Sequence, residues 1–298
     1  GIAVSGLVLP RIEGGARRPI DWTGFFLAAV AASGIVFGLS VISLPALPPA
    51  VGVATTLLGL GAAYAYIRHA RRSPDPILNL KLFRSPPFRA SITGGSLFRV
   101  GTGAVPFLLP LMLQLIFGLS PFQSGLLTFV SAIGALSMKF LATATLRAAG
   151  FRTVTIASAI GGGILIGAIA MFTPETPFPA IMATLLAGGF LRSMFFTSTN
   201  ALAFAEIDDK QAGQATAIMA AAQQVSVALG VACAGGLLEV VTALSGGGLD
   251  RSAFVVAFIF AGASGVLAAL FYLGLPRDVG TAISGHRAKA EERPEIQE

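Results

Sequence analysis

Apolar residues in this chain gather into long blocks that are separated by short polar or proline-rich breaks. Eight of these blocks are long enough to cross the ~30 Å hydrocarbon core of a bilayer as helices, which takes about 20 residues. They run over 22–43, 49–67, 88–116, 122–145, 153–172, 179–204, 212–244 and 252–275. The pattern therefore predicts an all-α membrane protein with eight transmembrane helices.

The breaks between the blocks carry residues that end helices or begin new ones, such as SPDP at 73–76 and SPP at 85–87. Asp21 is suited to cap the first complete block, and Trp22 suits the headgroup boundary. The apolar run at 1–9 would reach only about 13 Å as a helix. We interpret this run as the remnant of a preceding transmembrane helix.

The composition supports a membrane protein. Hydrophobic residues make up 54% of the chain and charged residues 11%, and the mean hydropathy is +0.80, whereas soluble domains carry about 25% charged residues. We interpret the net charge of +6 chiefly as an indicator of how the helices are oriented in the membrane. Because no basic cluster is interleaved with aromatic residues in a soluble segment, we expect no nucleic-acid partner.

The positions of the basic residues predict which way the helices point. If the loop at 10–21 is cytoplasmic, sixteen of the 20 Lys and Arg fall on the cytoplasmic side and one, Arg251, falls outside. Lys and Arg are retained on the cytoplasmic side of membranes, so the count favours a cytoplasmic tail at 276–298. The three remaining basic residues, Arg99, Lys139 and Arg192, lie inside the predicted helices.

Arg99 and Arg192 lie deepest in the apolar blocks. At 1.5 Å per residue they are about 15 Å and about 20 Å from the ends at which their helices enter the membrane, near its midplane. A charged side chain there costs at least ~2.5–3.5 kcal/mol and should face water or a counter-charge. We expect both to line a wet cavity, with a structural ion pair as the alternative. Lys139 lies nearer the boundary, where snorkelling is the better explanation.

Uncharged polar residues extend this candidate site. Asn200 and three glutamines lie within predicted helices, where they either line a cavity or bond neighbouring helices. Phe195 and Thr199 follow Arg192 at helical spacing and share its face with glycines and Phe196. The predicted substrate or coupling cavity consists of Arg99, Arg192, Gln114, Gln223, Gln224, Thr199, Asn200 and Phe195.

The last six blocks differ in their polar content. Charged or glutamine residues occur in the first, second, fourth and fifth of them, whereas the third and sixth carry no charge. This division predicts four helices around an aqueous path. GGSLFR at 94–99 is similar to GGFLR at 188–192, in blocks that cross in opposite directions. An inverted repeat of three plus three helices would place both arginines near its centre, where transporter sites lie.

Several classes of function are disfavoured. The chain has no GxxxxGK[ST], GxGxxG or GxSxG motif, so neither nucleotide binding nor a nucleophile elbow is indicated. Its one cysteine, Cys233, excludes a disulfide within the chain. No cluster of metal ligands or buried acid–base pair is visible. We therefore expect no enzyme activity, no metal and no cofactor.

The chain resembles the C-terminal part of a fourteen-span drug:proton antiporter of the major facilitator superfamily. The resemblance covers essentially the whole chain and includes a narrower subgroup of multidrug exporters. It depends on DWTG at 21–24, PILNLKLFRSPPFRAS at 76–91, FRVGTGAVPFLLPLMLQLIFGLSPFQSGLLTF at 98–129, FLRSMFFTSTNALAFAEID at 190–208 and AQQVSVALGVA at 222–232.

The resemblance implies an organisation and a location. Residues 22–67 match a two-helix hairpin between the family's halves, 68–87 a cytoplasmic loop, and 88–275 the C-terminal six-helix lobe. It implies an integral protein of the bacterial inner (plasma) membrane with a cytoplasmic C-terminus. The family's first six helices, which carry its acidic proton-coupling residue, are missing from this sequence.

The resemblance also implies an activity. The expected function is that of one lobe of a proton-coupled exporter of small amphipathic compounds, which is inactive without the N-terminal six-helix lobe. Its partners would be that lobe, the lipid bilayer, the substrate and protons. The alternative is a non-transporting membrane protein, for assembly or sensing, in which the intramembrane arginines form structural ion pairs.

Overall fold

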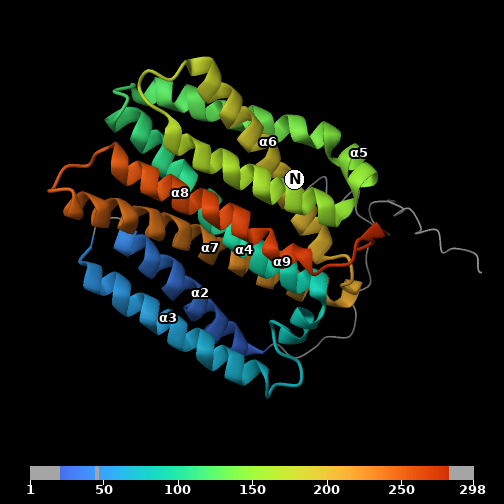
Figure 1. The fold of residues 1–298 in the computed structure, drawn as a ribbon. Helices are drawn as coiled ribbons and strands as arrows, with labels where there is room; N and C mark the ends of the chain where they lie inside the picture. Colours follow the sequence, from blue (N-terminus) through green and yellow to red (C-terminus); the bar gives the residue numbers. More distant parts are fainter. Residues whose placement is uncertain (1–20, 44–46, 282–298) are drawn as a thin grey trace, which may run out of the picture.

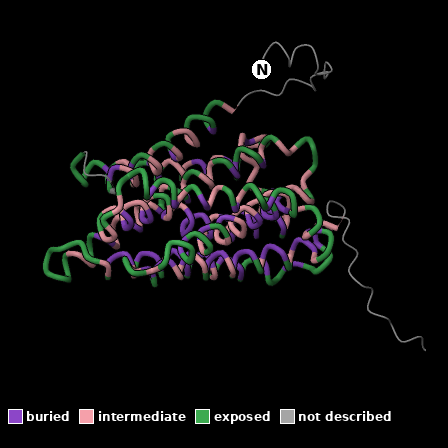
Figure 2. Tube along the Cα trace, turned by 90° about the horizontal axis from the view of Figure 1, so that it is seen from above, coloured by how far each residue is buried: buried purple, intermediate pink, exposed green. Residues whose placement is uncertain are grey.

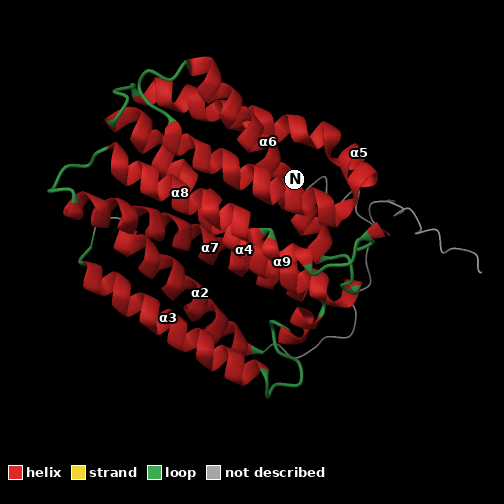
Figure 3. Cartoon of the chain, viewed as in Figure 1, coloured by secondary structure: helices red, strands yellow, loops and turns green. Residues whose placement is uncertain are grey.

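The computed structural model describes residues 21–43 and 47–281, and every regular element in these ranges is helical (Figures 1 and 3). The long helices are α2 (Trp22–Ser43), α3 (Pro49–Ala70), α4 (Pro86–Leu115), α5 (Pro121–Ala168), α6 (Phe178–Ala203), α7 (Asp209–Leu244) and α8 (Arg251–Ala268). Shorter helical turns are η1 (Leu80–Arg84), η2 (Ile169–Met171) and α9 (Leu270–Leu273). The predicted remnant at 1–9 and most of the predicted segments 10–21 and 276–298 lie outside the described residues.

Seven helices of the described chain are long and apolar enough to cross a membrane, and α5 accounts for the difference from the predicted eight. Its 48 residues would extend about 72 Å as one straight helix, more than twice the thickness of the hydrocarbon core. Gly150 interrupts it with φ 74° and ψ 161°. Leu127 and Ile166 belong to one buried cluster and Met138 to another. The chain therefore doubles back at Gly150 (Figure 1). The sequence predicts separate blocks at 122–145 and 153–172, and the loop that this implies at 146–152 is helical apart from Gly150.

Side-chain caps explain where several helices begin. Ser120 and Gln123 form a reciprocal capping box at the start of α5, which satisfies two backbone N–H groups that the first turn leaves open. Asp21 accepts the N–H of Gly24 at 2.8 Å, as its position before the first apolar block predicts.

The main bundle consists of α4 to α8, and α2 and α3 form a hairpin beside it. The hairpin contacts the bundle through α2 and α7. Figure 2 shows buried residues concentrated in the central helices, whereas α2, which follows the grey N-terminal trace, is mostly intermediate or exposed. Large apolar side chains such as Leu57 and Leu58 of α3 are exposed, which is the pattern of a helix that faces lipid.

Glycines allow the closest helix contacts. Gly34 of α2 lies against Gly59 of α3, where an added Cβ would come within 2.9 Å of the Gly59 Cα. Gly163 of α5 lies against α8, where a Cβ would come within 2.7 Å of the Gly262 carbonyl oxygen. In lipid, helices associate through such close packing because burial from water gives no driving force.

The two ends of the helical bundle differ in their content of basic residues. At one end, His69 lies 2.8 Å from Asp21, Ser85 donates to Glu206 at 2.9 Å, and Arg152 donates to the Leu273 carbonyl. The described basic residues of the connecting segments lie at this end. Arg251 lies at the other end, where it donates to carbonyls in the last turns after α5. This arrangement agrees with the charge asymmetry that the sequence predicts.

Candidate functional site

A cavity of about 960 Å³ lies between α4, α6 and α7. Its wall combines apolar side chains with five polar side chains from the predicted set. Those five are Arg99, Arg192, Asn200, Gln223 and Gln224. The remaining lining residues are Thr102, Gly103, Pro106, Phe107, Phe196, Ala220, Val227 and Val231. Helix α4 and the consecutive helices α6 and α7 thus bring most of the predicted site together.

Arg99 is held in the cavity wall by two neighbours on α6. One of its guanidinium nitrogens donates to Asn200 Oδ1 at 3.3 Å. The guanidinium carbon lies 4.8 Å from the centre of the Phe196 ring, within the range of a cation–π contact. The residue is only 7% exposed, so these contacts replace part of the hydration that the charge loses.

Arg192 occupies the cavity differently. It precedes Phe196 and Asn200 by four and eight residues, so all three side chains lie on one face of α6. Within residues 21–43 and 47–281, Arg192 has neither a hydrogen-bonding nor an ion-pairing partner. Its charge is therefore directed at the open cavity.

The wall on α4 has a polar feature that the sequence analysis did not select. Pro106 lies inside the helix and has no N–H to donate to the carbonyl of Thr102, four residues earlier. Both residues line the cavity. A proline in the middle of an apolar block was the available sequence signal for this site.

Three residues of the predicted set lie elsewhere. Phe195 is fully buried and stacks on Phe98, with ring centres 3.9 Å apart. Thr199 is buried and hydrogen-bonded to the Tyr272 hydroxyl at 3.1 Å. Gln114 lies in the last turn of α4, about 22 Å along the helix from Arg99.

The rotation of α6 explains two of these differences. Residues three and four positions after Arg192 flank its face on opposite sides. The structure turns the position at four, Phe196, toward the cavity and the position at three, Phe195, into the core. Only packing against the neighbouring helices decides between them.

The cavity walls agree in part with the expected division among helices. The predicted helices 88–116, 179–204 and 212–244 contribute to the wall, and 153–172 and 252–275 do not. The predicted helix 122–145 was also expected to contribute, and none of its side chains lines the cavity. In the described residues, the cavity is therefore bordered by three helices.

The charged side chains that line the cavity are all positive. None of the Asp and Glu residues in the described ranges lines it. Two cations in a low-dielectric wall need water, an anion or a carboxylate from outside this set, because uncompensated buried charge is costly. In the same ranges no group of His, Cys, Asp and Glu is arranged to hold a metal.

Comparison with known proteins gives the family. The profile of the major facilitator superfamily matches residues 91–296, more than half of the chain, and this match includes every residue that lines the cavity. The chain belongs to the major facilitator superfamily. Within this superfamily, it is 33% identical over 234 residues to HsrA of Haemophilus influenzae, named as a candidate transport protein. That alignment covers 78% of this chain and 50% of HsrA.

Other superfamily relatives carry a more specific name. The chain is 30% identical over 261 residues to MdtD of Pectobacterium carotovorum, named as a candidate multidrug resistance protein, covering 87% of the chain and 56% of MdtD. It is 26% identical over 284 residues to MdtD of Yersinia enterocolitica, covering 92% and 59%. The chain spans about half the length of the curated superfamily relatives it matches. It is thus an integral membrane protein of a transporter family rather than of an enzyme family.

Proposed function

We propose that this chain is the C-terminal lobe of a proton-coupled efflux transporter for small amphipathic compounds. The superfamily membership and the names of the relatives support a transport function. The observation that carries the proposal is that Arg99 and Arg192 share one cavity between membrane helices, with no described carboxylate in its wall. Such intramembrane charges mark substrate and ion pathways.

The proposed lobe crosses the membrane eight times. The two antiparallel segments of α5 each cross once, and the remaining long helices supply the other six crossings. The basic end of the molecule is cytoplasmic, because Lys and Arg are retained on that side. α4 to α8 then form a three-plus-three inverted repeat, with Arg99 and Arg192 in corresponding helices near its centre. As part of the same proposal, the membrane is the bacterial inner membrane and the C-terminus is cytoplasmic.

The chemistry of the wall supports an amphipathic substrate. Phe107, Phe196 and Val231 supply apolar surface, while the arginines and the two glutamines supply hydrogen-bond donors. A pocket of this kind takes ligands with an apolar body and a few polar groups. The open charge of Arg192 favours a ligand with an anionic or strongly electron-rich group.

Proton coupling requires a partner lobe in this proposal. The described cavity holds no carboxylate that could accept a proton. The proton acceptor therefore lies in the N-terminal six-helix lobe, where its carboxylate also offers a counter-charge to Arg192. Protonation of that carboxylate would release the arginine, and substrate movement would follow.

The test is gradient-driven efflux by the complete transporter, with Arg192→Ala, Arg192→Lys and Lys139→Ala compared at equal expression. We expect Arg192→Ala to lower the efflux rate about tenfold, the equivalent of about 1.4 kcal/mol, and Arg192→Lys to retain part of it. Lys139 is an exposed cation in the same membrane region that does not line the cavity, so its removal should leave efflux nearly unchanged. Unchanged rate and pH dependence in Arg192→Ala would instead favour a structural role for the arginines in a non-transporting protein.

A further inference from the structure

Two hollows follow one face of α3, away from the cavity described above. The first is an apolar groove of about 580 Å³ between the hairpin and helices α4 and α7. The second is a polar pocket of about 340 Å³ formed by the end of α3, the following loop and η1. Ala63, Tyr66 and Ile67 line the groove, and Ala70 and Arg71 line the pocket. These positions have the i, i+3, i+4, i+7, i+8 spacing of a single helical face, so the two hollows lie in line.

The groove is suited to a hydrocarbon. Its wall is made mainly of alanine and branched apolar side chains. Two of its hydroxyl groups are already bonded within the protein: Ser226 donates to the Ala222 carbonyl, and Tyr66 bonds both the carbonyl and the N–H of Leu78. A ligand there gains from burying apolar surface rather than from hydrogen bonds.

The pocket is suited to an anion. Arg71, Lys81 and Arg84 line it, together with one carboxylate, that of Asp75. It begins at the last residue of α3, where this membrane-length helix ends, and lies at the basic end of the molecule. Basic pockets at this level between membrane helices recognise anionic headgroups.

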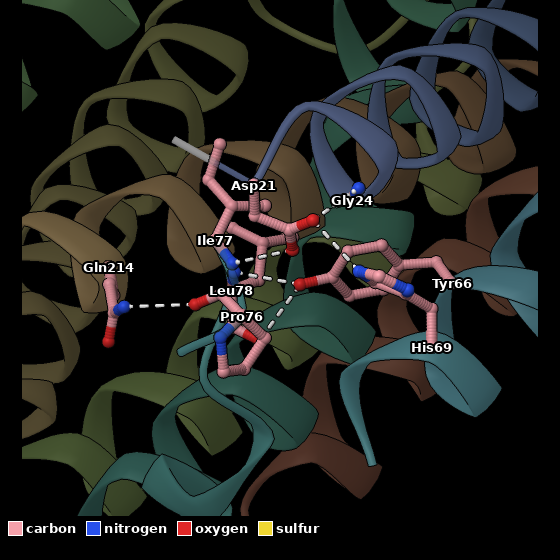
Figure 4. Close-up of polar contacts among 8 residues, drawn as sticks. All are labelled: Asp21, Gly24, Tyr66, His69, Pro76, Ile77, Leu78 and Gln214. Atoms are coloured by element: carbon pink, nitrogen blue, oxygen red, sulfur yellow. Dashed lines mark hydrogen bonds and ion pairs between the residues drawn. The ribbon is translucent and has the colours of Figure 1, made fainter. Parts of the chain in front are cut away.

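The walls of both hollows are fixed by polar contacts at the base of the hairpin (Figure 4). The N–H of Ile77 donates to Asp21 at 3.3 Å, and Gln214 of α7 donates to the Pro76 carbonyl at 3.1 Å. Together with the bonds between Tyr66 and Leu78, these contacts hold the loop against both the hairpin and the bundle. A site that is formed in advance loses less entropy when a ligand binds.

We propose that the two hollows bind one anionic phospholipid, with its headgroup phosphate among Arg71, Lys81 and Arg84 and one acyl chain in the groove beside Tyr66. A lipid fits the two hollows better than a soluble anion does, because the apolar groove continues from the basic pocket along α3 and offers a place for an acyl chain. The bound lipid would contact the hairpin and α4 and α7 at once, and so join the hairpin to the bundle.

The test measures lipids retained by the purified protein with mass spectrometry of the intact complex. The probes are phosphatidylglycerol, phosphatidylcholine and inorganic phosphate. The pocket variant combines Arg71→Gln, Lys81→Gln and Arg84→Gln. Its matched control combines Arg68→Gln, Arg72→Gln and Arg89→Gln, which removes the same charge at the same end from exposed residues outside the pocket.

We expect the pocket variant to weaken retention of phosphatidylglycerol about tenfold or more, since Lys and Arg near the membrane surface each strengthen binding to anionic lipid. The control should stay within about twofold, and phosphatidylcholine and phosphate should not be retained by the unaltered protein. Equal losses in both triple variants would show an unspecific surface attraction and overturn the proposal. Retention of inorganic phosphate as firmly as the lipid would overturn it as well.

A second pair of variants tests the acyl chain. Ala63→Phe places a ring in the groove, whereas Leu60→Phe adds a ring on the exposed side of the same helix. We expect only Ala63→Phe to lower retention of phosphatidylglycerol, with helix content and elution volume unchanged in both. Full retention by a folded Ala63→Phe protein would contradict the groove assignment, and a misfolded one would be replaced by Val225→Phe on the opposite wall.

Discussion

Arg99 and Arg192 line the same cavity but differ in how their charges are compensated. Arg99 has an amide oxygen and an aromatic ring beside it, whereas Arg192 has no bonding partner in the described part of the chain. Removing Arg99 should therefore disturb local packing as well as charge, while removing Arg192 should change chiefly the electrostatics of the cavity. Arg192 is the better reporter of what enters it.

Thiol labelling can show whether water reaches Arg192. In a Cys233→Ser background, we expect Arg192→Cys to react with a membrane-impermeant methanethiosulfonate, because the reactive thiolate forms in water and not in lipid. Ile164→Cys is the control, since Ile164 is 57% exposed on the outer surface of the bundle and outside the cavity. The measurement is a gel shift after labelling in membranes. Equal labelling at the two positions would contradict a hydrated cavity beside a lipid-facing α5.

Asp21 gives the base of the hairpin a dependence on pH. Burial opposes its charge, but the N–H groups of Gly24 and Ile77 and the ring of His69 outweigh this effect and hold the pKa of Asp21 below its ordinary value of 3.8. A carboxyl group whose pKa is depressed in the folded state stabilises the fold above the unfolded pKa, and this contribution disappears as pH falls through the folded value. Acidification below pH about 4 should therefore loosen the hairpin.

The measurement is the unfolding midpoint in a denaturing detergent at several pH values from about 6 to about 3. This range includes the ordinary pKa of an aspartate side chain, which is about 4. Asp21→Asn keeps a side-chain oxygen for the helix cap but has no charge, so the acid-dependent part of the loss should be smaller in this variant. Asp21→Ala also removes the cap and should lose about 1 kcal/mol at every pH. Identical pH profiles for the unaltered protein and Asp21→Asn would contradict this assignment.

At the scale of single elements, the turn inside α5 depends on one residue. Gly150 has φ 74° and ψ 161°, a backbone region that is essentially restricted to glycine. We expect Gly150→Ala to lower the free energy of unfolding by about 1–3 kcal/mol. Gly236→Ala in α7 is the control, because a Cβ there meets nothing within 4 Å and the backbone is helical. Detergent unfolding monitored by circular dichroism measures both, and equal midpoints would show that the turn tolerates a side chain.

The elements were predictable from the sequence to different degrees. The bounds of α2, α3, α4, α6 and α7 agree closely with the apolar blocks, because the bilayer dictates both the length and the polarity of a crossing segment. The loop predicted at 146–152 was not found, since a single glycine reverses the chain there. Apolar periodicity cannot distinguish a turn of one residue from a loop of seven.

At the scale of the whole molecule, the candidate site was predicted in outline. Charge placed deep in an apolar block is expensive, so Arg99 and Arg192 could be selected without any knowledge of tertiary contacts. Both Phe195 and Phe196 were placed on the face of Arg192, and the structure puts only Phe196 in the cavity wall, because the choice depends on the rotation of α6 against its neighbours. The two hollows along α3 were not predicted, because the basic and apolar residues that line them belong to segments that were interpreted separately.

The contact between α4 and α7 lies between the cavity that contains Arg99 and Arg192 and the apolar groove beside the hairpin. Gly230 lies against the carbonyl of Val100, and Gly103 lies against the main chain of Val227, so the two helices pack closely at both points. Arg99 and Val100 are sequence neighbours that face opposite compartments. The packed contact between α4 and α7 thus keeps the apolar groove beside the hairpin separate from the charged cavity.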